Sequence, residues 1–233
     1  MKYIIIIMLL FFSLQSCKVN NTLTFHNDAT ISTDVVVDMS EMIDMEQQAN
    51  EEGKNSVKNV HMPQFPKEWQ SLYDYQKTIK DSIPTDKVDI LKRSMIKGIF
   101  KDDKEVGFEV KCDRFTSEEL LTMDKAIGTR NISPFVLSMF KWDGRELRIN
   151  TEGLEKGGED EEEAERCISQ MKKMFKIELY NTLVLESKIK KIKGKHPYVQ
   201  KVDAHTIKIT LQENEGKKKK RRDKEIVIIT SNK

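Results

Sequence analysis

Apolar residues recur at every second position in several short runs of this chain, a spacing typical of half-buried β-strands. Leu23 and Phe25 alternate with threonines, and residues 31–37 resume the same period after a polar segment at 26–28. The Asn and Asp in that segment favour a turn. The pattern therefore predicts a β-hairpin over residues 22–37.

A spacing of three to four residues replaces the alternation in five segments and predicts amphipathic helices. Pro84 separates two of them. Thr116 and Glu119 have the spacing of a capping box, in which side-chain and backbone groups bond reciprocally at a helix start. The predicted helices cover residues 39–49, 68–81, 87–97, 116–127 and 164–175.

Alternating runs return between and after these helices. Asp143 and Gly144 form a strong hairpin signal, and Gly194 and Pro197 mark turns in a strand-rich C-terminal part. Strands are predicted near residues 106–112, 135–140, 145–149, 177–192, 206–211 and 226–229.

These elements predict an α+β fold, in which antiparallel β-hairpins and a sheet pack with several amphipathic helices. Once residues 1–16 are removed, 217 residues remain (233 − 16), enough for a sizeable buried core. The predicted organisation is a signal peptide at 1–16, a lipidated leader at 17–21, an N-terminal α+β region at 22–151 with a helical insert near 50–97, an acidic loop at 152–163, and a C-terminal helix and strands at 164–233, all packed as one body.

The N-terminus has the features of a bacterial lipoprotein signal peptide. Lys2 precedes an apolar run at 4–12, which is shorter than the roughly 20 residues needed to span a bilayer. The run has the length of a signal-peptide core, and the sequence LQSC at 14–17 ends it in the form of a lipobox. We therefore predict lipid attachment at Cys17. An ordinary secretory signal is the alternative.

Lipid on Cys17 attaches a chain to a membrane without a spanning helix, since each buried methylene contributes about 0.8 kcal/mol. Lys18 stands where Asp is typical of inner-membrane retention. The predicted location is the cell envelope, with a palmitate-type anchor in the outer membrane and the body facing the periplasm.

The charge of the chain is balanced. Charged residues make up 33% of the sequence, yet the net charge is only +2. This balance gives no reason to expect nucleic acid as a partner, and an envelope location argues against it.

Six successive basic residues lie between the last two predicted strands. Such a run can attract anionic lipid headgroups, at about 1 kcal/mol per charge close to the surface. It can equally form a solvated hairpin tip that blocks edge-to-edge pairing. The candidate membrane-contact residues are Lys217, Lys218, Lys219, Lys220, Arg221 and Arg222.

No catalytic, cofactor or metal motif occurs in the sequence. The four histidines lie in separate segments, and neither H-E-x-x-H nor C-x-x-C is present. A phosphate-binding loop, a dinucleotide fingerprint and G-x-S-x-G are also missing. The acids at 159–163 fit a solvated linker better than a calcium loop, which needs spaced ligands. We predict no catalytic residue, no cofactor and no metal.

Two groups of residues leave alternatives open. Cys112 and Cys167 can pair in an oxidising compartment or remain small buried hydrophobic residues. An aromatic group can line a ligand groove or cover the sheet, and covering is the favoured interpretation. That group is Phe65, Trp69, Tyr73 and Tyr75.

Four parts of the chain carry a family resemblance. They are Thr22-Leu23-Thr24-Phe25 with Val37-Asp38-Met39-Ser40-Glu41-Met42, Phe65-Pro66-Lys67-Glu68-Trp69 with Ser71-Leu72-Tyr73, Gly107-Phe108 leading to Phe115-Thr116, and Trp142-Asp143-Gly144. They resemble a group of small lipoproteins from the Bacteroidota. More distantly, a hairpin and an amphipathic helix after a lipid anchor are similar to the LppM-type lipoprotein domain. Both resemblances imply an envelope lipoprotein, and neither supplies catalytic residues.

The predicted function is that of a membrane-anchored envelope lipoprotein, with a body that is a non-enzymatic binding or structural module. Its partners are the membrane, through the N-terminal lipid, and a protein, lipid or glycan of the envelope. The alternative is a hydrolase that acts on envelope polymers with scattered carboxylates.

Overall fold

The computed structural model describes the chain in several segments. The described residues are 16–41, 43–44, 64–79, 83, 85–120, 139–151, 176–211 and 222–231. The acidic loop at 152–163, the predicted helix at 164–175 and most of the predicted helix at 39–49 lie outside them.

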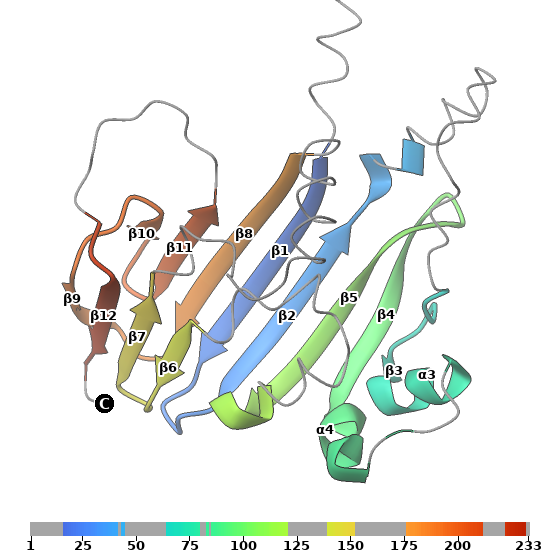
Figure 1. The fold of residues 1–233 in the computed structure, drawn as a ribbon, viewed down its shortest axis with the longest axis horizontal. Coiled ribbons are helices and arrows are strands. Elements are labelled where there is room, and N and C mark those ends of the chain that lie inside the picture. Colours follow the sequence, from blue (N-terminus) through green and yellow to red (C-terminus); the bar gives the residue numbers. More distant parts are fainter. Residues whose placement is uncertain are drawn as a thin grey trace, which may run out of the picture.

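Eight strands form one large sheet, shown in Figure 1, in the order β10-β11-β8-β1-β2-β5-β4-β3. Neighbouring strands are antiparallel except β1 and β8, which are parallel. The strands are β1 (Ser16–Phe25), β2 (Ile31–Asp38), β3 (Gln70–Ser71), β4 (Ser94–Lys101), β5 (Lys104–Phe115), β8 (Lys176–Leu185), β10 (Val199–Lys201) and β11 (Thr206–Leu211).

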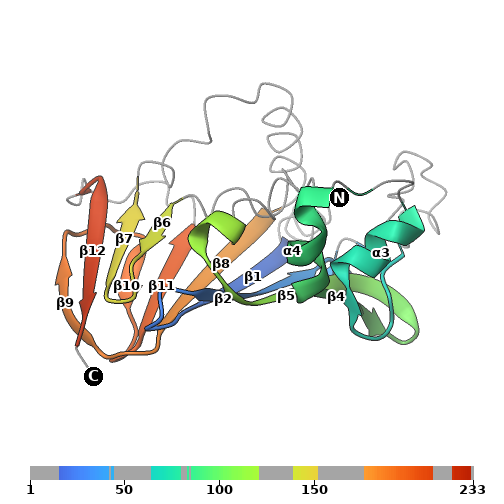
Figure 2. The same ribbon diagram turned by 90° about the horizontal axis from the view of Figure 1, so that it is seen from below.

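A smaller antiparallel sheet and two short helices lie on one side of the large sheet, as Figure 2 shows. The small sheet has the order β6-β7-β12-β9. Its strands are β6 (Phe140–Trp142), β7 (Glu146–Asn150), β9 (Ile189–Lys193) and β12 (Glu225–Thr230). The helices are α3 (Leu72–Ile79) and α4 (Val88–Arg93), the latter preceded by the 3₁₀ turn η1 (Thr85–Lys87).

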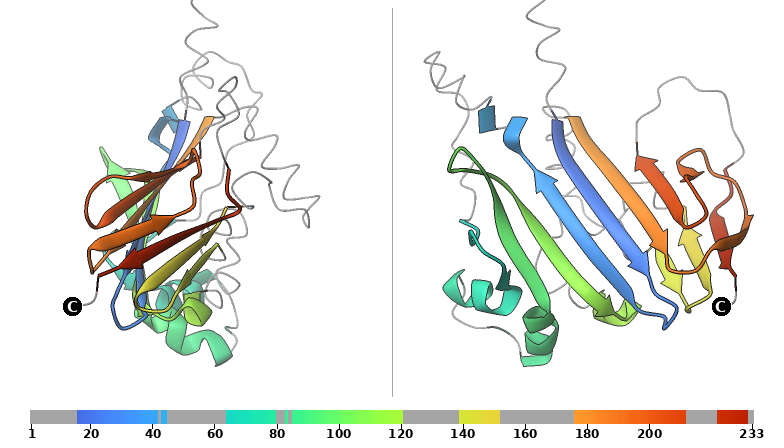
Figure 3. Two further views of the ribbon diagram at one scale, coloured as in Figure 1. Left: turned by 90° about the vertical axis from the view of Figure 1, so that its left-hand side faces the viewer. Right: turned by 180° about the vertical axis from the view of Figure 1, so that it is seen from behind.

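The main core lies between the two sheets. Leu23 and Phe25 of β1 are 0% exposed, and the rings of Phe140 and Trp142 pack edge-to-face on Phe25 at 5.9 and 5.6 Å. Strand side chains alternate between faces, so Thr22 and Thr24 point to the opposite face of the large sheet and are less buried. The right panel of Figure 3 shows that face without any described helix or strand covering it.

The two helices cover the other part of the same inner face. Leu72 and Tyr75 of α3 and Leu91 of α4 are buried with Ile96 of β4. Helix α3 begins where the Ser71 hydroxyl accepts a hydrogen bond from the backbone N–H of Asp74 at 3.0 Å. This contact satisfies a backbone donor that a helix start leaves without an intrahelical partner.

The structure confirms the α+β fold class and the strand-rich C-terminal part. The predicted first hairpin is β1 and β2, and the hairpin around Gly144 is β6 and β7. The capping box is also present, because Thr116 N donates to Glu119 Oε2 at 2.8 Å and Glu119 N donates to Thr116 Oγ1 at 3.2 Å.

The helix predicted over 87–97 is wrong over its last four residues, 94–97. Helix α4 ends at Arg93, and Ser94 is already extended at φ −95° and ψ 134°. From there the chain forms β4, in which Ile96 lies opposite Val110 of β5. Residues 88–96 fit a helical spacing locally, but pairing with the long β5 strand satisfies the backbone of 94–97 and buries Ile96.

Two further expectations differ from the structure. Residues 17–21, predicted as a leader, form part of β1, because they pair with β2 and β8 from Lys18 and Cys17 onward. The strands on either side of 217–222 do not form the hairpin that was one interpretation of this segment. Strand β11 belongs to the large sheet and β12 to the small sheet, and these two strands do not pair with each other.

None of the helices within the described segments is long and apolar enough to cross a membrane.

Candidate functional site

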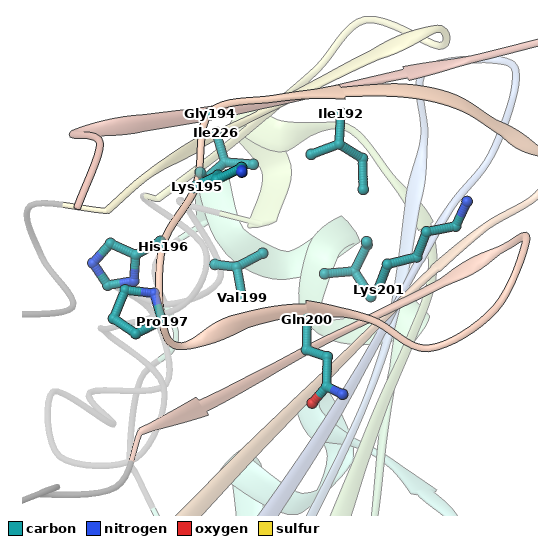
Figure 4. Close-up of a pocket in the computed structure, with 10 residues that line it drawn as sticks. Ile192, Gly194, Lys195, His196, Pro197, Val199, Gln200, Lys201 and Ile226 are labelled. Carbon is teal, nitrogen blue, oxygen red and sulfur yellow. The ribbon is translucent and has the colours of Figure 1, made fainter. Parts of the chain in front are cut away.

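A pocket lies where the chain crosses from the small sheet to the large one. Strand β9 is an edge of the small sheet, β10 is an edge of the large sheet, and residues 194–198 join them. The pocket between these edges has a volume of about 620 Å³. Figure 4 shows Ile192 entering it from β9, with Val199 and Lys201 entering from β10.

The crossing depends on a glycine. Gly194 has φ +87°, a conformation that residues with a Cβ rarely adopt, and a Cβ there would lie 2.6 Å from the backbone oxygen of Glu225. The next residue is held by two backbone contacts. Lys195 N donates to Asp223 Oδ2 at 2.8 Å, and Asp223 N donates to Lys195 O at 3.0 Å. These bonds tie the crossing to the segment that enters β12.

The floor of the pocket is aliphatic. Ile207 and Ile226 are 0% and 1% exposed and belong to the main core, and Ile192 and Val199 pack against the same core. The rim is polar and cationic. Lys195, Gln200 and Lys201 are exposed there, and the buried His196 completes the crossing. An aliphatic floor under lysine amines suits a ligand with an apolar part and an anionic group.

The C-terminal part of the chain is strongly basic, a signal that the whole-chain charge conceals. Residues 188–233 contain 15 Lys or Arg and 5 Asp or Glu, a net charge of +10 (15 − 5). Residues 1–187 contain 25 and 33, a net charge of −8. Charge counted by segment could therefore have found this region from the sequence. Its exposed lysines include Lys190, Lys191 and Lys193 of β9.

Strand register places the crossing toward the end of the large sheet where β1 begins, and we call that end the Cys17 end. Val199 lies opposite Ile209, Ile209 opposite Asn181, and Asn181 opposite Asn21. Strand β10 runs away from the Cys17 end, so residues 194–198 lie on the Cys17 side of Val199. Three strand spacings of about 4.8 Å separate β10 from β1, roughly 14 Å.

Two of the predicted site residues, Cys17 and Arg222, lie within the described segments. The backbone of Cys17 lies in β1 opposite Ile177 of β8. Of the basic run, Lys217, Lys218, Lys219, Lys220 and Arg221 lie outside the described residues. Arg222 is exposed and precedes Asp223, the residue that holds the crossing at Lys195. The described end of the basic run therefore adjoins the pocket.

A Ser–His–Glu grouping lies at the opposite end of the sheet, by the β1–β2 turn. His26 Nε2 is 2.8 Å from Ser32 Oγ, and His26 Nδ1 is 3.9 Å from Glu186 Oε2. Ser32 also has a structural task. Its hydroxyl donates to Asp113 Oδ1 at 2.7 Å and accepts from Arg114 N at 3.1 Å. These bonds hold the bulge where β5 shifts register against β2.

The aromatic group behaves as a cover. Phe65 packs on Tyr75 at 5.6 Å and on Phe108 of β5 at 4.6 Å between ring centroids. Trp69 instead lies between the amines of Lys97 and Lys111, each 4.7 Å from its ring. These contacts support packing over the sheet, and the pocket is formed by other elements.

Cys112 is buried in the main core, and its Sγ donates to Ser94 Oγ at 3.6 Å. Burial raises the pKa of this thiol to about 12, which keeps it protonated at neutral pH. Cys167 lies outside the described residues. Within the described segments, no three His, Cys, Asp or Glu side chains gather in a way that could hold a metal ion.

No protein-family model matches the chain, and no curated protein matches it. Among solved structures, it is similar to the NMR structure of the folded domain of LppM from Mycobacterium tuberculosis, with a TM-score of 0.39 and 10% identity over 93% of this chain and 91% of that one. This neighbour has the name of the looser sequence resemblance. Similarity at this level supports no conclusion about a shared fold or function. The resemblance to Bacteroidota lipoproteins finds no support in any match.

Proposed function

We propose that this chain is a lipid-anchored protein of the cell envelope whose body is a non-enzymatic binding module at an anionic membrane surface. The main support is the uneven distribution of charge along the chain. Residues 188–233 have a net charge of +10, and residues 1–187 have a net charge of −8. About 1 kcal/mol per cation near an anionic surface makes such a region a strong contributor to membrane contact. Lys18 in place of Asp supports delivery to the outer membrane, with the body facing the periplasm.

The position of the anchor supports the same proposal. Strand β1 begins at Ser16, so acyl chains on Cys17 would join the sheet with no leader between them. The Cys17 end of the large sheet would then face the headgroups. The crossing at 194–198 leaves β10 toward this end, and β11 ends there, since Leu211 lies opposite Leu179 and Leu179 opposite Val19.

Lipidation is tested by palmitate labelling of the full chain in a bacterial host. We expect label and membrane retention in the wild type and in the control Cys167→Ala, and neither in Cys17→Ala. Label that persists in Cys17→Ala contradicts the anchor. Label that is absent from the wild type supports the alternative of an ordinary secretory signal.

Membrane contact is tested with the unlipidated mature chain, residues 17–233 carrying Cys17→Ser, and sedimentation with phosphatidylglycerol vesicles. Lys190→Gln, Lys191→Gln and Lys193→Gln together should weaken binding more than tenfold, since each charge contributes about 1 kcal/mol. The control removes three exposed lysines elsewhere, Lys67, Lys92 and Lys141. Equal losses in both variants, or binding that salt leaves unchanged, contradict the basic surface.

The second candidate is the hydrolase, and the contact between Ser32 Oγ and His26 Nε2 is the observation that favours it. A serine becomes a nucleophile when a neighbouring base accepts its proton, so Ser32 would act in this way once its hydroxyl proton turns from Asp113 to His26. A fluorophosphonate probe tests this candidate. Label on the wild type that Ser32→Ala abolishes supports a hydrolase, and an unlabelled folded protein counts against it.

A further inference from the structure

We propose that the pocket between β9 and β10 binds one acyl chain of an anionic lipid or fatty acid, with the anionic group held at the lysine rim. The delivery of that ligand from the bilayer rests on the proposed function. The chemistry of the site rests on the pocket itself. Ile207 and Ile226 at its floor belong to the main core between the two sheets.

The size and lining of the pocket define the ligand class. A volume of about 620 Å³ lies within the usual range for small-molecule sites, about 300–1,000 Å³. The floor residues Ile192, Ile207 and Ile226 have no side-chain hydrogen-bonding groups. A glycan needs such groups for its hydroxyls, because burying them without partners is unfavourable. A hydrocarbon chain needs only apolar contact.

The rim determines the charge of the ligand. Two of the ten residues that line the pocket are lysines, and none of the ten is acidic. Figure 4 shows Lys201 extending from β10 along the opening toward the side of β9. A lysine lays its methylene stem along apolar surface while its amine stays in water. Lys195 and Lys201 are therefore placed to meet a carboxylate or phosphate while their stems continue the apolar wall.

The location of the pocket fits a ligand that comes from a bilayer. The crossing lies toward the Cys17 end of the large sheet, about three strand spacings from β1. An acyl chain leaving the leaflet that holds the anchor would reach the opening without crossing the body. The net charge of +10 in residues 188–233 would enrich anionic lipids at that place.

The experiment uses the unlipidated mature chain, residues 17–233 with Cys17→Ser, which retains every described element apart from Ser16. The ligands are radiolabelled palmitate, lysophosphatidylglycerol and lysophosphatidylcholine, below their critical micelle concentrations, with hexadecanol as the uncharged arm. We expect saturable binding of palmitate and lysophosphatidylglycerol, and at least tenfold weaker binding of the other two. If palmitate alone binds, the ligand is a free fatty acid. If lysophosphatidylglycerol binds as well, the pocket also accepts an anionic phospholipid headgroup.

Two variants locate the binding. Val199→Glu places a carboxylate in the pocket wall and should weaken palmitate binding more than tenfold. Its matched control is Val202→Glu, three residues away on a side chain that is 57% exposed. Lys195→Gln with Lys201→Gln should also weaken palmitate binding about tenfold while leaving the floor intact, and its control is Lys141→Gln with Lys208→Gln. This rim variant keeps the test decisive if Val199→Glu fails to fold.

The outcomes separate this inference from the proposed function. A folded wild type that binds neither palmitate nor lysophosphatidylglycerol overturns the inference, whatever its vesicle binding. Equal palmitate binding in the folded pocket variants and their controls also overturns it, as does hexadecanol that binds as tightly as palmitate. Palmitate binding with the expected variant losses sustains it even where binding to phosphatidylglycerol vesicles is absent, and that absence counts only against the membrane-surface proposal.

Discussion

The inner face of the large sheet is covered by strands on its β10 side and by helices on its β3 side. On the β10 side, 18 buried residues of the described segments form one cluster that joins both sheets. On the β3 side, α3 and α4 add a cluster of four. Because stability grows with the apolar area buried, the strand-covered side should dominate the folding free energy. It also carries the pocket and the basic strand β9, so the proposed site lies on the more stable part of the molecule.

The largest expected effect comes from the strand-covered core. Phe25→Ala removes a fully buried ring that contacts Phe140 and Trp142, and we expect a loss of about 3–5 kcal/mol in the free energy of unfolding. Urea unfolding followed by tryptophan fluorescence and circular dichroism measures it, and both signals should shift together. A loss below about 1 kcal/mol would show that the core between the sheets is not the main source of stability.

A smaller and more local effect is expected under the helices. Leu91→Ala should lower the free energy of unfolding by about 2–3 kcal/mol, because Leu91 is 0% exposed but its cluster is small. Hydrogen exchange should quicken in α3 and α4 and stay slow in β1 and β8. Exchange that quickens equally in both places would mean that the two covers unfold as one unit.

The junction between the two sides should show an intermediate effect. Ser32→Ala removes the hydroxyl that bonds Asp113 and the backbone of Arg114, and should lower the free energy of unfolding by about 1–2 kcal/mol. The matched control is Thr24→Ala, since Thr24 is the cross-strand neighbour of Ser32. Thermal unfolding compares the two variants, and equal stabilities would contradict a structural role for the Ser32 hydroxyl.

The smallest effect is expected on the uncovered outer face, where Glu109 lies between Lys97 and Lys111. Burial raises the pKa of Glu109, but hydrogen bonds and charge from Lys111 and Lys97 outweigh it and hold the pKa below its ordinary 4.5. A depressed folded-state pKa contributes stability above the unfolded value, and this contribution is lost as the pH falls through the folded value.

Glu109→Gln should therefore lower the free energy of unfolding by less than about 1 kcal/mol at pH 7. The difference from the wild type should shrink as the pH falls below 4.5 and the wild-type carboxyl becomes neutral. Urea unfolding from about pH 3 to about pH 7, a range that includes the titration of carboxyl groups, measures the difference. A difference that grows in acid would show that the ion pairs do not stabilise the folded state.

Local sequence patterns predicted the positions of strands better than they predicted which strands pair. The alternation around Leu23 and Ile31 located the first hairpin, and Asp143-Gly144 located the second, because turn chemistry and side-chain period are properties of neighbouring residues. The same local logic failed at Ser94. There the helical spacing of apolar residues continues beyond Ser94, although the backbone from Ser94 onward pairs with β5.

The candidate site was less predictable than the fold. The basic run at 217–222 pointed to the C-terminal part of the chain, but not to the pocket formed there by β9 and β10. Ile207 and Ile226 come from different sheets. Their proximity depends on how the two sheets pack, and the sequence pattern of either strand does not indicate it. The expectation that the strands flanking 217–222 form a hairpin was wrong for the same reason, because β11 and β12 are consecutive in the chain but lie in different sheets.

The sequence by itself determined the α+β class and the positions of most strands, since these depend on residues close together in the chain, and the same local reasoning predicts the lipobox at Cys17. Tertiary structure alone decided that β1 pairs in parallel with β8, from Ser16 opposite Lys176 onward. It also decided that β9 and β10 end in different sheets. Those outcomes bring together segments that are far apart in the chain, so they depend on which faces bury the most apolar surface together. The pocket forms because β9 and β10 lie in different sheets.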